Sequence, residues 1–155
     1  MYEEGGPKIM TETVGFITGF GQHWSISSAD ELDQILDLVV EQAAQADDPV
    51  AVSLFYPDDM SDLNSTALLF GLGREWSFLE WASPERHLYV PGDEDESEPS
   101  HWWYSCDYSE YPPGRGVPIE IVRATARAFI RTKGERPPWL HWMEEKAGNE
   151  LSEAS

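Results

Sequence analysis

The chain has 155 residues, of which 29 are acidic and 10 are basic, so its formal net charge is −19. This length suits one domain, and the excess of acid argues against unassisted binding to nucleic acid or to an anionic membrane, because both are captured through Lys and Arg. Hydrophobic residues make up 41% and aromatic residues 12% of the chain. Acidic disordered chains are poor in such residues, so we expect a folded domain with an acidic surface.

The first third of the chain predicts strands with a helix between them. Residues 13–20 alternate loosely, which predicts a strand, and residues 23–27 continue it as a second strand or a turn. A helix over about 29–46 follows, with Ser28 placed to cap it. Residues 50–56 alternate again and predict a strand. The apolar face of the helix consists of Leu32, Ile35, Leu36, Val39, Val40 and Ala43.

The middle of the chain predicts strands and an acidic loop. Residues 66–72 and 75–82 predict two strands, and the glycines at their junction predict a tight hairpin. Residues 87–90 predict a further short strand. Low-complexity acidic sequence bounded by prolines follows, and we expect a flexible loop over about 91–100.

The last third predicts an aromatic strand, a helix and a final strand. Residues 101–106 (HWWYSC) predict the aromatic strand, and the proline- and glycine-rich residues 108–116 predict a loop. A second helix is predicted over 118–133, with Gly134 as the residue that ends it. Residues 139–143 predict a last strand.

Strands that follow one another directly, with two main helices, are typical of the α+β class. We therefore expect a single domain over 1–155, with a mostly antiparallel sheet of about six or seven strands. Its core extends over about 12–143, and the polar tail 144–155 is expected to fray.

Compartment and targeting are predicted from what the sequence lacks. Cys106 is the single cysteine, so no intrachain disulfide can form, which fits a reducing cytosol. The first eight residues do not resemble a signal peptide, and no apolar run approaches the roughly 20 residues of a membrane span. We expect a cytoplasmic protein.

The acidic residues are concentrated before the second helix. Residues 1–117 hold 23 acids and 4 bases, whereas residues 118–155 hold six of each. Five acids fall within residues 93–98. The simplest interpretation of such a run is a solvated loop. The Trp and Tyr residues beside it favour a binding role as a lid over a cationic cleft, although the same aromatics can equally pack in a core.

Arginines recur every fourth residue along the second predicted helix, at Arg123, Arg127 and Arg131. Such a stripe can bind an anionic partner, but a solvated face or internal pairing with the surplus acids is the simpler interpretation.

The metal motifs tested against the sequence fail. Asp93, Asp95 and Ser97 match the first positions of a calcium loop, but Glu98 stands where glycine is required and Tyr104 where glutamate is required. One cysteine and four scattered histidines form no zinc motif.

The catalytic motifs fail as well. Cys106 with His101 as a base has no supporting pattern, and an inert thiol is the simpler interpretation. The glycines of Gly71-Leu72-Gly73 lack the third glycine of a dinucleotide loop. We therefore expect a binding protein with no catalytic residue, metal or cofactor.

Two segments resemble a known family. Residues 71–81 (GLGREWSFLEW) resemble its GxG…FLxW/Y hairpin. The C-terminal run resembles its closing sequence, through Trp103-Tyr104, Tyr111-Pro112-Pro113, Val117-Pro118, Ala124, Ala128, residues 129–137 (FIRTKGERP) and Trp142. This is family one of the immunity proteins of bacterial polymorphic-toxin systems. The resemblance covers about residues 66–142, and Thr132 to Pro137 carries one residue more than the usual TGxRP.

The resemblance implies a protein that acts by binding a toxin. Members are often encoded beside deaminase-type toxins, including one that deaminates cytosine in double-stranded DNA. Enzymes that act on nucleic acid have cationic clefts, and an inhibitor that covers such a cleft is expected to be acidic and to carry aromatic anchors. The resemblance and the charge therefore lead to the same hypothesis.

We predict an immunity protein that binds a cognate toxin domain with a basic surface. We expect it to bind neither nucleic acid nor a membrane. The acids are expected to occupy the positions of substrate phosphates, and the aromatics to anchor, with one of Trp102 and Trp103 facing the core. The predicted binding residues are Asp93, Glu94, Asp95, Glu96, Glu98, Trp102, Trp103, Tyr108 and Glu110.

Two alternatives stay open. An acidic interaction module or nucleic-acid mimic would bind several unrelated cationic proteins and release them in salt. A small carboxylate-based enzyme would hold a carboxylate pair in a concave pocket. The sequence makes no prediction of the oligomeric state.

Overall fold

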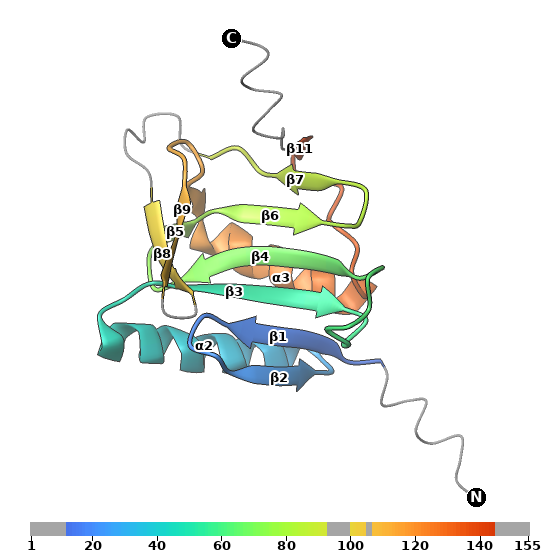
Figure 1. Ribbon diagram of the computed structural model, residues 1–155, viewed down its shortest axis with the longest axis horizontal. Helices are drawn as coiled ribbons and strands as arrows, with labels where there is room; N and C mark the ends of the chain where they lie inside the picture. The colour runs from blue at the N-terminus through green and yellow to red at the C-terminus, as the bar shows by residue number, and fades with distance from the viewer. Residues whose placement is uncertain (1–11, 93–99, 105–106, 145–155) are drawn as a thin grey trace, which may run out of the picture.

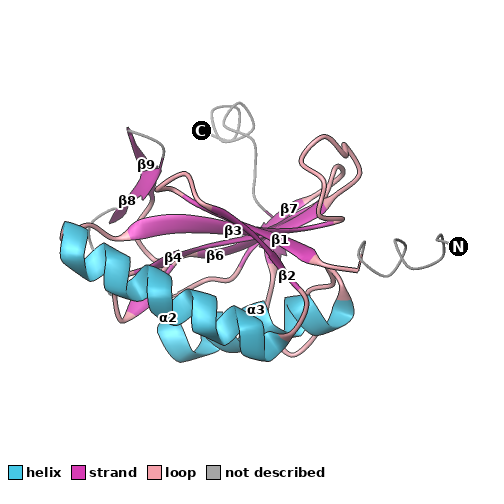
Figure 2. Ribbon diagram, turned by 90° about the horizontal axis from the view of Figure 1, so that it is seen from below, coloured by secondary structure: helices cyan, strands magenta, loops and turns pink. Residues whose placement is uncertain are grey.

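The computed structural model describes residues 12–92, 100–104 and 107–144. Two helices, α2 (Ala29–Ala46) and α3 (Ile119–Thr132), cover one face of a twisted sheet (Figures 1 and 2). This arrangement confirms the predicted α+β class, and both helices lie within one residue of the predicted ends.

The main sheet runs in the order β11-β7-β6-β4-β3-β1-β2, and all of these neighbours are antiparallel. Its strands are β1 (Val14–Thr18), β2 (His23–Ile26), β3 (Val50–Tyr56), β4 (Thr66–Leu72), β6 (Leu79–Ala82), β7 (His87–Tyr89) and β11 (Met143–Glu144). With the hairpin described next, the described residues form a nine-stranded sheet, larger than the six or seven strands predicted.

A hairpin of β8 (Ser100–Tyr104) and β9 (Asp107–Tyr111) crosses one end of this sheet (Figure 1). It joins the sheet through a parallel bridge between Val50 and Trp103, and the Trp103 N–H donates to the Pro49 carbonyl at 2.8 Å. A second, two-stranded sheet pairs β5 (Trp76–Ser77) with β10 (Val117–Pro118).

Helix α2 begins at the predicted cap. The Ser28 Oγ accepts a hydrogen bond from the Glu31 N–H at 3.1 Å, and the Glu31 carboxylate accepts from the Ser27 N–H at 2.8 Å. These bonds satisfy donors that the first helical turn leaves free. The helix ends at Asp47, whose left-handed conformation lets its N–H reach back to the helix carbonyls.

Helix α3 is fixed to the sheet by the loop that follows it. The Gly134 carbonyl accepts hydrogen bonds from Trp81 Nε1 at 3.0 Å and from Thr66 Oγ1 at 3.1 Å. Gly134 has φ of 104°, and a Cβ there would lie 2.5 Å from Thr66 Oγ1. Glycine is therefore required by both conformation and space. The motif at residues 129–137 thus holds the helix in place.

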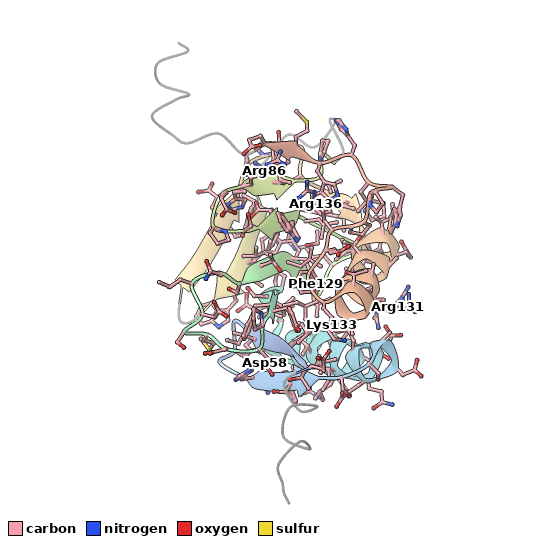
Figure 3. All side chains as sticks on the ribbon, turned by 90° about the vertical axis from the view of Figure 1, so that its right-hand side faces the viewer. Asp58, Arg86, Phe129, Arg131, Lys133 and Arg136 are labelled. Carbon is pink, nitrogen blue, oxygen red and sulfur yellow. The ribbon has the colours of Figure 1, made fainter. Side chains whose placement is uncertain are left out.

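The arginine stripe of α3 joins the two helices. Arg123 lies 3.0 Å from the Asp37 carboxylate, and Arg127 lies 3.1 Å from the Asp33 carboxylate. Internal pairing is therefore confirmed for these two arginines. Arg131 is exposed and points away from the sheet (Figure 3).

Two hydrophobic clusters lie on opposite faces of the sheet. The main core fills the space between sheet and helices and includes Phe16, Leu54, Phe70 and Phe129. The second cluster lies under the hairpin and consists of Ala51, Phe78 and Trp102, with Leu69, Trp76 and Tyr111 packed against it.

Three local predictions are wrong. Residues 108–116 are not all loop, because Asp107–Tyr111 pairs with β8 along its whole length. The tight hairpin expected between 66–72 and 75–82 is instead a wide connection, since Trp76 and Ser77 leave to pair with β10. The strand expected over 139–143 begins at Met143, because residues 138–140 turn before it.

Candidate partner-binding face

The face of the sheet opposite the helices is here called the open face. Alternation along β3 points Val52 and Leu54 into the main core and Ser53 and Phe55 toward the open face. The register sets Ser53 beside Ile17 and Leu69, and Phe55 beside Gly15 and Ala67. Ser53, Ile17, Leu69 and Ala67 are half-buried, so the middle of this face is an accessible strip of small and aliphatic side chains.

The hairpin covers one end of the open face and is held there by Trp102. This side chain is 0% exposed and packs edge-on against Phe78, with ring centroids 5.3 Å apart. Its Nε1–H donates to Ser100 Oγ at 3.0 Å. A Cβ on Gly71 would lie 2.2 Å from the Trp102 ring, so glycine is what lets the indole lie flat on β4.

The residues of the hairpin that were predicted to bind a partner therefore differ in how exposed they are. Trp102 belongs to the second cluster and has no surface to offer a partner, so we remove it from the candidate set. Trp103 is half-buried against the main core. Glu110 is exposed, with its carboxylate 3.7 Å from His101 Nε2. Tyr108 stands opposite Trp103 in the register. The five acids Asp93, Glu94, Asp95, Glu96 and Glu98 lie outside the described residues.

A buried ion pair attaches the segment after the hairpin to the open face. Arg115 Nη1 lies 3.0 Å from Glu80 Oε2, and both side chains are less than 10% exposed. The Arg115 guanidinium also stacks on the Tyr89 ring, 3.8 Å from its centroid. His87 Nε2 completes the set at 2.9 Å from Glu80 Oε1. Because each buried charge has a partner, we assign this cluster the structural role of holding the segment after the hairpin against the sheet.

The connection between β3 and β4, residues 57–65, lies at the other end of the open face. It is called the β3–β4 loop below. Its first acid, Asp58, has a carboxylate that accepts from Thr13 Oγ1 at 2.9 Å and from Ser25 Oγ at 2.5 Å, with His23 Nε2 at 3.5 Å. A Cβ on Gly15 would lie 2.7 Å from Asp58 Oδ1, which places this carboxylate on the open face.

This arrangement does not resemble a hydrolase triad. A catalytic serine donates its proton to histidine, which an aspartate orients. Here the Ser25 hydroxyl donates directly to the Asp58 carboxylate, and His23 contacts the other oxygen. Within the described residues, no three His, Cys, Asp or Glu side chains form a group that could hold a metal ion. Neither α2 nor α3 combines the length and apolar character that crossing a bilayer would need.

Charge on the described surface is unbalanced because 19 acids stand against eight bases there, and most of these bases contact other groups of the chain. Of the eight described bases, Arg86, Arg115, Arg123, Arg127 and Lys133 contact carboxylates. Arg74 and Arg136 stack on tryptophan rings. The segment 29–48, which contains α2, holds seven acids and no base. The free surface is therefore dominated by carboxylates.

The described residues thus combine a helix-backed sheet, an open face and an acidic surface. The family model of the immunity protein Imm1 matches residues 21–144, which is four-fifths of the chain. The chain belongs to this family of immunity proteins. A comparison with curated proteins gave no match.

Proposed function

We propose that this chain neutralises a cognate toxin domain that acts on nucleic acid, such as a deaminase, by covering its basic substrate cleft in the cytoplasm. Membership of the Imm1 family carries the first part of this proposal. The chemistry of the partner is inferred from the charge of the surface.

The charge supports a cationic partner for a physical reason. Nineteen acids and eight bases lie in the described residues, and seven of those bases contact carboxylates or rings of the same chain. The remaining carboxylates repel one another and would gain from a basic surface. Nucleic-acid enzymes offer such a surface where they bind phosphates.

The hairpin end of the open face is the proposed contact for the cleft. Glu110 is exposed there, and Trp103 is partly exposed. Tyr108 and the acids of residues 93–98 are proposed to join them because the sequence connects them directly to this hairpin. In this proposal the carboxylates take the positions of substrate phosphates.

Co-expression tests the function directly. The toxin domain encoded next to this chain is expressed with and without it, and survival should depend on its presence. In parallel, the purified chain should bind the catalytically inactivated toxin domain. Absence of binding at micromolar concentration, with both proteins folded, would show that the proposal is wrong.

Salt and an unrelated basic protein of similar size provide the specificity control. A nucleic-acid mimic would bind both proteins and release both at high salt. The proposed function predicts binding to the toxin domain that survives high salt, and no comparable binding to the control protein.

Neutralising Asp93, Glu94, Asp95, Glu96 and Glu98 tests the role given to the acids. Because charge accelerates encounter, these changes should slow association more than they speed dissociation. A matched variant changes five exposed acids elsewhere, namely Glu12, Glu41, Glu85, Glu120 and Glu135, to glutamine. A dominant effect on dissociation would show that the acids make specific contacts instead.

A further inference from the structure

The β3–β4 loop exposes two large apolar side chains. Leu63 is 88% exposed and Met60 is 68% exposed, the highest values among the large hydrophobic residues described. The same loop contains Asp58, Asp59 and Asp62 and no basic residue. Its tip therefore presents apolar side chains next to carboxylates.

Hydrogen bonds fix this loop in place. The Asp59 carboxylate accepts from the Ser61 hydroxyl at 2.7 Å and from the Ser61 N–H at 3.0 Å. The Asp62 carboxylate accepts from the Asn64 N–H at 2.8 Å, and the Asp62 N–H donates to the Asp59 carbonyl at 3.0 Å. Asp58 joins the loop to Thr13, just before β1, and to Ser25 of β2 through the bonds described above.

Because hydrogen bonds hold the β3–β4 loop in one conformation, the exposure of its two apolar side chains is a fixed feature of the surface. Met60 and Leu63 keep most of their surface in water, and hydration of apolar surface is unfavourable. An exposed apolar patch rimmed by polar groups is typical of a protein–protein contact. Hydrogen bonds from Ser61 also lower the pKa of Asp59, so its carboxylate remains charged beside them.

We propose that the β3–β4 loop is a second contact with the toxin domain, in which Met60 and Leu63 fill an apolar pocket bordered by basic groups. The inference rests on the proposed function for the identity of the partner. The negative charges of Asp59 and Asp62 set the sign of the pocket border, because a neutral or acidic rim would offer them no opposite charge.

The loop and the hairpin can contact one partner together. The bonds of Asp58 and the position of Gly15 place the base of the loop on the open face, which the hairpin also covers. They lie at opposite ends of β3, whose six residue steps span about 20 Å. A standard interface buries about 800 Å² on each partner and is about 30 Å across, which is wide enough for both.

Paired substitutions test the proposal. Met60→Ser with Leu63→Ser removes the two apolar groups, and Leu38→Ser with Met143→Ser changes the same residue types at other exposed positions. Affinity for the inactivated toxin domain and thermal unfolding are measured for both variants. The loop variant should lose at least about tenfold in affinity, mainly through faster dissociation, and the control variant less than about threefold.

The outcomes separate the two proposals. If the wild-type chain fails to bind the toxin domain, the proposed function is wrong. If the wild-type chain binds and the loop variant binds equally well, the function stands and the anchoring role of the loop is wrong. A loop variant with a lowered unfolding temperature is replaced by Met60→Gln with Leu63→Gln. Retained affinity in that folded variant would also overturn the anchoring role.

Discussion

The segments at the two ends of strand β3 differ in whether their large hydrophobic side chains are buried. At the hairpin end, Trp102 is fully buried between β8 and the sheet. At the loop end, Met60 and Leu63 face solvent although the loop is held by hydrogen bonds. The aromatic hairpin therefore contributes a buried side chain to the second cluster. The acidic β3–β4 loop contributes the exposed apolar side chains.

Aromatic residues beside acids therefore do not by themselves mark an interface. The hairpin needs a large side chain to fill the space above the glycine of β4. Among the described residues, no strand or helix covers the apolar side chains of the β3–β4 loop. Whether a side chain is buried or available to a partner depends on whether another segment packs against it.

The largest effect is expected for Trp102→Ala. Removing a fully buried indole leaves a cavity under the hairpin and should destabilise the fold by about 3–5 kcal/mol, measured by urea unfolding. Trp103→Ala, at a half-buried position, should cost less and is the comparison. If Trp102→Ala unfolds like the wild type but fails to bind the toxin domain, the contrast between the two ends is wrong.

Asp58→Ala should have the next largest effect. Its carboxyl is 10% exposed and accepts two hydroxyl hydrogen bonds, so its loss should cost about 1–3 kcal/mol. Amide hydrogen exchange in the β3–β4 loop should also become faster. Asp62→Ala, which removes one bond at the exposed tip, is the matched control. Equal effects of the two changes would show that Asp58 does not anchor the loop.

Met60→Ser with Leu63→Ser should leave stability within about 0.5 kcal/mol of the wild type, because both side chains are already hydrated. The contrasting change is Leu54→Ala in the main core, which should cost about 2–5 kcal/mol. Chemical unfolding measures both. A large loss of stability from the loop changes would show that these side chains pack within the chain.

The smallest effect concerns the pKa of Asp59. The Ser61 hydroxyl is the main cause of its lowering, so Ser61→Ala should raise this pKa toward its ordinary value, as measured by a carboxyl NMR titration. A lowered carboxyl pKa stabilises the loop above the unfolded-state pKa, and this is lost as pH falls through the folded-state value. Because its Asp59 pKa is higher, the Ser61→Ala variant should lose this stabilisation of the loop at a higher pH than the wild type. An unchanged titration would mean that the hydroxyl bond does not hold the loop.

Local patterns predicted the helices well because their signals lie within a few residues. The spacing from Leu32 to Ala43 and the cap at Ser28 defined α2, and Gly134 marked the end of α3. The strand pairing was harder. Trp76 and Ser77 read as part of one strand with residues 79–82, yet they pair with Val117 and Pro118, about forty residues away. Periodicity carries no information about such a partner.

The class of fold, the surplus of acid and the resemblance to immunity proteins could all be predicted from the sequence, because composition, periodicity and motif spacing are read along the chain. Which side chains are available to a partner depends on the folded structure. Trp102 is buried because β4 passes beneath it, and Leu63 is exposed because no described strand or helix covers it. Burial depends on contacts between distant segments, so neither result could be read from the chain in one dimension.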